Sequence, residues 1–253
     1  MEFSVDQNAL EAFLLAAVRL TAFLMIAPPF SYNAIPARVK AMLAIGLALA
    51  ASPRAAAGYE SLGTAHLIGA LAMELLTGAV LGFLVYITFA AVQSAGSLID
   101  LFSGFQMAQA FDPQSMVNGA QFTRLFQMAA LALMFASDAY QLILLGLVTS
   151  FTTLPLGGTN DLSSPADVMV EGLTGMFVAA VQIAGPLLVV LFLADAGLGL
   201  LTRVAPALNA FAMGFPLKIL ITLMLAGTIF IALPRVVSSL TDQVARTLMG
   251  VGQ

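Results

Sequence analysis

Two long apolar runs without a charged residue most constrain how this chain can fold. They cover residues 75–99 and 172–194. Each exceeds the roughly 20 helical residues that cross a hydrocarbon core of about 30 Å. Over the 253 residues, 60% are hydrophobic and only 9% are charged, against roughly 25% charged in an ordinary soluble domain. The chain is therefore predicted to be an integral membrane protein.

The apolar segments favour helices over a barrel, because strict alternation of apolar and polar residues is absent. We expect an all-α membrane fold of about six long helices, with re-entrant or broken segments among them. Residues 40–52 are too few for a comfortable span at about 1.5 Å per residue, so they predict a re-entrant or protein-buried helix. The tail, 235–253, is weakly amphipathic. The remaining expected segments are 10–30, 64–99, 121–136, 138–155, 168–202 and 211–233.

Several classes of function are disfavoured by what the chain lacks. It has no cysteine and one histidine, His66, so thiolate chemistry and histidine-based metal sites are not expected. Nucleophile-elbow, zinc-protease, phosphate-loop and dinucleotide motifs are missing. A net charge of −4 provides no basic surface for nucleic acid. We therefore expect no enzyme activity, no cofactor, no metal and no nucleic-acid partner.

Three ionisable residues, Arg19, Glu74 and Asp195, lie inside apolar runs. Placing a charge at the centre of a bilayer costs about 2.5 to 3.5 kcal/mol on insertion scales, so such residues need a reason. One reading is a relay for protons or ions. The favoured reading is burial against a partner chain that supplies the counter-charge, because the acids do not form the series that a relay requires.

Small residues recur at spacings that let helix backbones approach one another. Gly78 and Gly82 form a GxxxG motif, and Gly197 and Gly199 lie beside alanines. Such positions predict close helix packing without identifying the helix that packs there.

The semi-polar stretch 100–116 interrupts the apolar runs. It combines Gly104, two phenylalanines, a methionine and an Asp-Pro pair at residues 112 and 113. Irregular backbone at membrane depth is tolerated only when it is buried in protein or lines an aqueous cavity. The stretch therefore predicts a shielded loop with a deformable apolar surface, and an amphipathic surface loop is the alternative.

Four blocks of sequence together resemble one known family. They are "AIPARVKAMLAIGLAL", "AGSLIDLFSGFQMAQAFDPQS", "TLPLGG" and "LGLLTRVAPALNAFAMGFPLKI". In this order they resemble the FliR family of the flagellar type III export gate, whose injectisome counterpart is SctT. The last block is the most specific and fits the flagellar branch better.

The resemblance implies a non-enzymatic, single-copy subunit of a protein-conducting gate. In this family one FliR-like chain assembles with five FliP-like and four FliQ-like chains, next to FlhB-like and FlhA-like export proteins. Unfolded protein substrates would pass through the pore, within the bacterial inner membrane at the flagellar basal body, partly displaced toward the periplasm. Residues 1–160 would form a FliP-like part with a plug loop at about 100–116, and residues 161–253 a FliQ-like helical hairpin.

The resemblance also implies roles for particular residues. The hairpin turn would face the cytoplasm, in agreement with the distribution of lysine and arginine around Arg203 and Lys218, and it would contact lipid phosphates or an FlhB-like partner. Asp112 would cap the following helix or pair with Arg124. The buried charges Arg19, Glu74 and Asp195 would lie at subunit contacts. The expected plug residues are Gly104, Phe105, Gln106, Met107, Phe111, Asp112 and Pro113, and the expected turn residues are Arg203, Pro206, Asn209, Phe211, Gly214, Phe215, Pro216 and Lys218.

Two other functions stay open at this point. The polar stretch and the turn near residue 210 could be the paired broken helices of a secondary transporter or ion channel subunit of the inner membrane. The chain could also be a structural membrane scaffold without a conduit.

Overall fold

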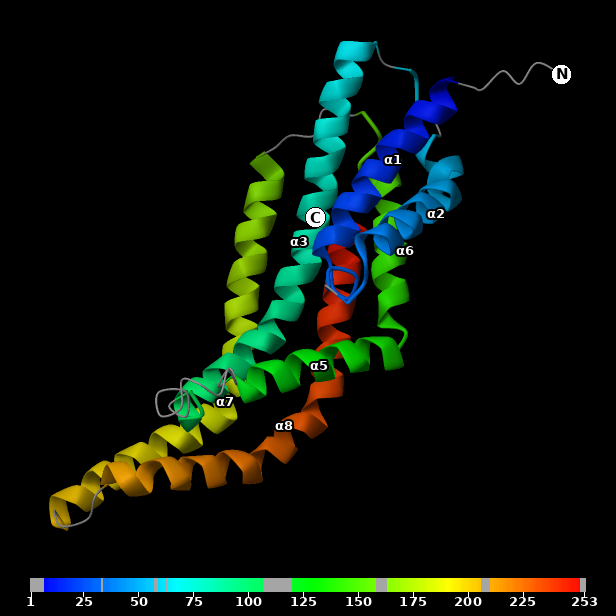
Figure 1. The fold of residues 1–253 in the computed structure, drawn as a ribbon. Coiled ribbons are helices and arrows are strands. Elements are labelled where there is room, and N and C mark those ends of the chain that lie inside the picture. The colour runs from blue at the N-terminus through cyan, green and yellow to red at the C-terminus, as the bar shows by residue number, and fades with distance from the viewer. Residues whose placement is uncertain are drawn as a thin grey trace. The chain divides into compact units, whose positions relative to one another are not determined.

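The computed structural model describes residues 7–32, 34–56, 59–61, 63–106, 120–157, 163–205 and 210–250. Within these ranges every regular element is an α-helix, and seven helices are present (Figure 1). The predicted all-α membrane fold is confirmed.

The first three helices are α1 (Gln7–Ile26), α2 (Ala37–Ala55) and α3 (Thr64–Ser103). Helix α2 has 19 residues, so the expectation of a segment limited to 40–52 was too short. It starts directly after Pro36 and continues through Pro53. The residues added at both ends are less apolar than residues 40–52. Hydropathy alone therefore underestimated its length.

Helices α5 (Gln121–Ala136) and α6 (Ala139–Thr153) form a broken pair. The break falls at Ser137 and Asp138, and Asp138 has a left-handed backbone with φ 54°. A left-handed residue cannot continue a right-handed helix, so the chain changes direction there. Both helices agree closely with the expected segments 121–136 and 138–155.

The last two helices, α7 (Ser163–Val204) and α8 (Ala210–Leu248), extend the expected segments 168–202 and 211–233 at both ends. Helix α8 continues through the weakly amphipathic tail as far as Leu248, and it contains Pro216 and Pro234. It begins at Ala210, so Phe211, Gly214, Phe215 and Pro216, which were expected in the hairpin turn, lie in the helix. Prolines are tolerated inside membrane helices, where neighbouring groups satisfy the freed carbonyls.

Four of the described helices are long and apolar enough to cross a membrane: α1, α3, α7 and α8. The broken pair of α5 and α6 makes a fifth candidate if it counts as one span. Helix α2 is not among them. The expectation that the turn near Arg203 and Lys218 faces the cytoplasm stays a prediction.

The chain forms two compact units, and each is assembled from separate stretches. Unit 1 contains residues 1–88, 137–172 and 240–253, and unit 2 contains residues 89–136 and 173–239. The division at residue 160 into a FliP-like part and a FliQ-like hairpin stays a prediction.

In unit 1, helix α2 packs on α1 and also contacts α6 (Figure 1). The buried face of α2 consists largely of alanines, which let the α1 backbone come close. The fully buried side chains of this core include Leu15, Leu20, Phe23, Leu24, Ile143 and Leu147.

In unit 2, the core is formed by buried side chains from the end of α3 and from helices α5, α7 and α8. Its fully buried members include Ile99, Phe126, Met134, Leu187 and Leu191. By contrast, many large apolar side chains of α7 and α8 are exposed within this chain, for example Phe192 at 65% and Ile231 at 81%. That surface requires an apolar environment outside the chain.

Candidate functional site

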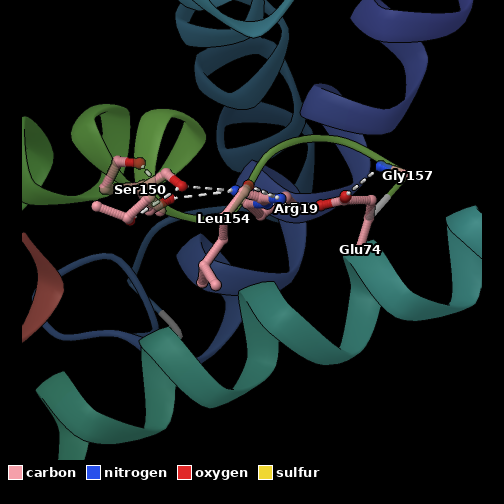
Figure 2. Close-up of polar contacts among 7 residues, drawn as sticks. Arg19, Glu74, Ser150, Leu154 and Gly157 are labelled. Atoms are coloured by element: carbon pink, nitrogen blue, oxygen red, sulfur yellow. Dashed lines mark hydrogen bonds and ion pairs between the residues drawn. The ribbon is translucent and has the colours of Figure 1, made fainter. Parts of the chain in front are cut away.

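Unit 1 is organised around a buried ion pair. Arg19 of α1 donates from Nε to Oε2 of Glu74 in α3 at 2.5 Å, and both residues are almost completely buried (Figure 2). The two residues lie 55 positions apart in the chain. Their pairing therefore depends on how α1 packs against α3.

The Arg19 guanidinium also binds the C-terminal end of α6. It donates to the carbonyl oxygen and the hydroxyl of Ser150 at 3.3 Å each and to the carbonyl oxygen of Leu154 at 2.9 Å (Figure 2). Its carbon Cζ lies 4.5 Å from the centre of the Phe151 ring. The Ser150 carbonyl oxygen also accepts a hydrogen bond from the Leu154 N–H, and Leu154 follows the last residue of the helix. Carbonyl groups at this end of a helix carry partial negative charge. Arg19 thus stabilises the end of α6 as well as Glu74.

Glu74 has a second partner beyond α6. Its Oε1 accepts from the backbone N–H of Gly157 at 3.4 Å. Together the two charged residues connect α1, α3, α6 and the residues that follow α6. The sequence suggested that a partner chain supplies the counter-charge, but here the same chain does so. A contact of these residues with another subunit stays a prediction.

Gly78 explains how Arg19 and Glu74 come so close. A methyl group at Gly78 would overlap the backbone carbonyl oxygen of Arg19, and one at Gly82 would lie 3.0 Å from the carbonyl oxygen of Phe23. The GxxxG motif therefore packs against α1 in this chain. A methyl group at Gly197 or Gly199 would meet no atom of the described structure within 4 Å.

Unit 2 contains a buried carboxylate at the beginning of the polar stretch. Asp100, near the end of α3, is fully buried. Its oxygens accept from the backbone N–H groups of Phe122 and Thr123, both at 2.9 Å, and from the Thr123 hydroxyl at 2.7 Å. Asp100 therefore caps the N-terminus of α5, a role that was not predicted from the sequence. The acidic residue at the edge of an apolar run was its only signal.

A row of phenylalanines continues from the same point. The ring centres of Phe105 and Phe122 are 5.6 Å apart, those of Phe122 and Phe126 are 6.0 Å apart, and those of Phe126 and Phe230 are 5.4 Å apart. The row links the end of α3 through α5 to α8. Only Phe105 was among the expected site residues, although the four-residue spacing of Phe122 and Phe126 places both on one helix face.

Gly104 marks the point where α3 ends. It has φ +86°, a conformation that favours glycine, and a methyl group there would lie 2.6 Å from Cδ1 of Phe215. The structure thus brings together one expected plug residue and one expected turn residue. Gln106 follows with an exposed side chain. Met107, Phe111, Asp112 and Pro113 lie outside the described residues, as does the expected capping by Asp112.

The remaining turn residues flank the start of α8. Lys218 of α8 forms an ion pair with Asp195 of α7 at 2.6 Å, with side-chain exposures of 16% and 47%. Arg203, in the last turn of α7, is exposed. Gly214 and Pro216 lie in the first turns of α8, with the backbone of Phe211, while Pro206 and Asn209 lie outside the described residues.

Two hydrogen bonds connect residues between α2 and α3 to α1. The Tyr59 hydroxyl donates to Oε2 of Glu11 at 3.1 Å, and the Ser61 backbone N–H donates to Oδ1 of Asn8 at 3.1 Å. Burial, and then the hydrogen bond to the Glu11 carboxylate, raise the pKa of Tyr59 to about 12. These two hydrogen bonds connect Tyr59 and Ser61 to α1.

The described residues contain no group of histidines or acids that could hold a metal ion. The buried side chains of Arg19, Glu74 and Asp100 bind backbone groups or an opposite charge. These contacts stabilise the fold. Fold and contacts thus define an all-helical membrane protein in which the buried residues Arg19 and Asp100 bind helix ends.

Comparison with known proteins identifies the family. Residues 10–244 match the family described as bacterial export proteins, family 1. The flagellar biosynthetic protein FliR of Bacillus subtilis (strain 168) is 31% identical over 250 residues, 95% of this chain and 95% of the relative. FliR of Escherichia coli (strain K12) is 31% identical over 212 residues, 84% of this chain and 81% of the relative. The Yop proteins translocation protein T of Yersinia pestis is 29% identical over 147 residues, 57% and 56% of the two chains.

The chain belongs to the FliR family of bacterial export proteins. The expectation drawn from the four sequence blocks is confirmed at this level.

Proposed function

We propose that this chain is the single-copy subunit of a flagellar type III protein export gate, where it forms part of the protein-conducting pore and its plug. The match of residues 10–244 to the export family carries the proposal. The exported cargo would be the unfolded axial proteins of the flagellum. The assembly would lie in the bacterial inner membrane at the flagellar basal body, partly displaced toward the periplasm.

The exposed apolar surface of α7 and α8 supports assembly with other helical chains. In the proposed gate it faces five FliP-like chains, four FliQ-like chains and membrane lipid. Arg203 and Lys218 lie near the turn of this hairpin, where FlhB-like and FlhA-like proteins would approach from the cytoplasm. Asp195 pairs with Lys218 and remains about half exposed, so it can also meet a neighbouring subunit.

The end of α3 supports a plug between residues 104 and 113. A 40-residue apolar helix stops at Gly104, where the backbone turns with a positive φ and packs on Phe215. A chain that leaves its helix within apolar surroundings must be shielded by protein or line an aqueous cavity. In the proposed gate that cavity is the closed pore.

The buried charges favour this function over a secondary transporter or ion channel subunit. Arg19 and Glu74 bind each other and the backbone around the end of α6. A relay would need ionisable groups that exchange protons or ions with a solute path. Their present partners support a structural role.

Co-expression tests the proposal. A tagged chain expressed with FliP-like and FliQ-like chains is expected to yield one stable complex with subunits in the ratio one to five to four, measured by native mass spectrometry. The tagged chain alone is the control and is expected to be poorly behaved, because the surface of α7 and α8 is then uncovered. A well-behaved monomer or dimer that moves a small solute across liposomes would contradict the export gate.

A further inference from the structure

Asp100 contacts both sides of the stretch that separates α3 from α5. Its carboxylate belongs to the last turn of α3, and its three donors belong to the first turn of α5, 22 and 23 residues later in the chain. The N–H groups at the start of a helix have no intrahelical acceptors. A carboxylate there satisfies two of them and also interacts favourably with the positive end of the helix dipole.

A second contact holds the same two helix ends together. Gly96 lies one turn before Asp100, and a methyl group at this position would be 2.6 Å from the carbonyl oxygen of Phe122. The backbones of α3 and α5 therefore touch at this level. The ring contact between Phe105 and Phe122 adds a third connection just beyond Asp100.

We propose that Asp100 is a positioning residue that holds the end of α3 and the start of α5 at a fixed separation, and so sets the base of the stretch between them. This inference rests on the proposed plug function of that stretch. The carboxylate acts through the backbone of Phe122 and Thr123 and touches no cargo. We call these contacts of Asp100 with Phe122 and Thr123 the clamp. When the clamp is lost, the end of α3 and the start of α5 move apart and the closed gate leaks.

The geometry requires an aspartate. One oxygen accepts from Phe122, and the other accepts from both groups of Thr123. The amide of Asp100→Asn keeps the volume but turns one acceptor into a donor that faces another donor. Thr123→Val removes only the hydroxyl bond and leaves both backbone bonds, so its effect is expected to be smaller.

The test uses the complex of this chain with FliP-like and FliQ-like partners, reconstituted into liposomes of phosphatidylethanolamine and phosphatidylglycerol that contain a small fluorescent dye. The wild-type complex is the sealed reference, and a complex whose chain lacks residues 104–113 is the leaky reference. With Asp100→Asn, dye release is expected to rise about tenfold or more, as loss of a charge-assisted bond predicts. The control is Thr222→Val, because this buried hydroxyl in unit 2 donates to the Lys218 carbonyl oxygen of its own helix.

A cysteine pair separates positioning from folding. The natural chain has no cysteine, so Asp100→Cys combined with Thr123→Cys creates the only thiols in this chain, at side chains that meet in the structure. The reduced pair is expected to leak. Oxidation with copper phenanthroline is expected to seal the gate again, since a disulfide replaces the hydrogen bonds as the clamp, and dithiothreitol is expected to reverse the effect.

The outcomes distinguish this inference from the proposed function. If the deletion of residues 104–113 leaves the complex sealed, the plug is overturned and the inference with it. If the deletion leaks but Asp100→Asn stays as tight as wild type, only the clamp is overturned. The clamp is also overturned if oxidation of the cysteine pair restores neither assembly nor sealing, because Asp100 would then serve folding alone.

Discussion

The two units bury charge in opposite ways. In unit 1 a cation and an anion from different helices meet, and each also binds backbone at the end of α6 or just beyond it. In unit 2 the carboxylate of Asp100 is held by backbone N–H groups and a hydroxyl, without a basic side chain among its hydrogen-bond donors in the described region. The first solution neutralises charge with charge, and the second uses the partial charges of a helix terminus.

The difference determines what the loss of one group leaves behind. When one member of a buried ion pair is removed, the other remains as an uncompensated charge in an apolar core. When the carboxylate of a cap is removed, only neutral N–H groups remain unsatisfied. Unit 1 should therefore be more sensitive than unit 2 to a substitution that changes a single charge.

The largest effect is expected for Glu74→Gln, which keeps the side-chain shape and leaves the Arg19 guanidinium without its counter-charge. The free energy of unfolding is expected to fall by about 3–5 kcal/mol. Asp100→Asn is expected to cost less, about 1–3 kcal/mol. The shift in the midpoint of thermal unfolding in detergent compares the loss of stability of the two variants.

Two further variants control this comparison. Glu171→Gln makes the same chemical change at an exposed position of α7 and is expected to stay within about 0.5 kcal/mol of wild type. The double variant Arg19→Met with Glu74→Leu removes both charges and should recover part of the loss. If it is as unstable as Glu74→Gln, the binding of Arg19 to the α6 carbonyls outweighs the ion pair.

A smaller effect is expected where helix backbones touch next to each buried charge. Gly78→Ala would push a methyl group into the Arg19 carbonyl of unit 1, and Gly96→Ala would push one into the Phe122 carbonyl of unit 2. Overpacking of this kind costs about 1–3 kcal/mol. The same thermal unfolding measurement should show both variants destabilised.

The matched controls are Gly69→Ala in unit 1 and Gly227→Ala in unit 2. In the described structure nothing lies within 4 Å of a methyl group at either position. Both are expected to be neutral or to stabilise by about 0.5–1 kcal/mol, because alanine favours a helix over glycine. Equal effects at all four glycines would mean that helix propensity, rather than close packing beside the charges, decides stability.

The smallest effect is expected at the partly exposed contact of Tyr59 with Glu11. Because burial and this hydrogen bond raise the pKa of Tyr59 to about 12, from an ordinary value of about 10, the contribution of this group to stability is complete below about pH 10. It is lost as the pH rises from there toward 12. Titration of tyrosinate absorbance should show a late step that Tyr59→Phe removes. A titration curve that Tyr59→Phe leaves unchanged above about pH 10 would contradict the contact.

The helices themselves could largely be predicted from the sequence. The expected segment 121–136 coincides with α5, and the apolar runs at 75–99 and 172–194 lie inside α3 and α7. Helix ends were less predictable. The segment expected at 40–52 extends to Ala37 and Ala55, and α8 continues to Leu248, because hydropathy records apolar character and a helix stops only at a backbone signal.

Sequence motifs predicted close packing better than they predicted partners. The GxxxG motif at Gly78 was recognised, but its contact with the backbone of Arg19 depends on where α1 lies. Gly197 and Gly199 are also small residues in an apolar helix, but they make no such contact within the described structure. Spacing identifies a surface that can be approached, and the tertiary structure determines which helix approaches it.

By itself, the sequence determined that this chain is helical, lies in a membrane and belongs to an export family, because local apolarity and family motifs are properties of contiguous residues. The tertiary structure alone decided which groups satisfy the buried charges. Arg19 meets Glu74 across 55 residues, and Asp100 meets the start of α5 across 22. A buried charge must pair with an opposite charge or a helix end that the packing of apolar faces brings near. That packing depends on several distant segments and cannot be predicted from one of them.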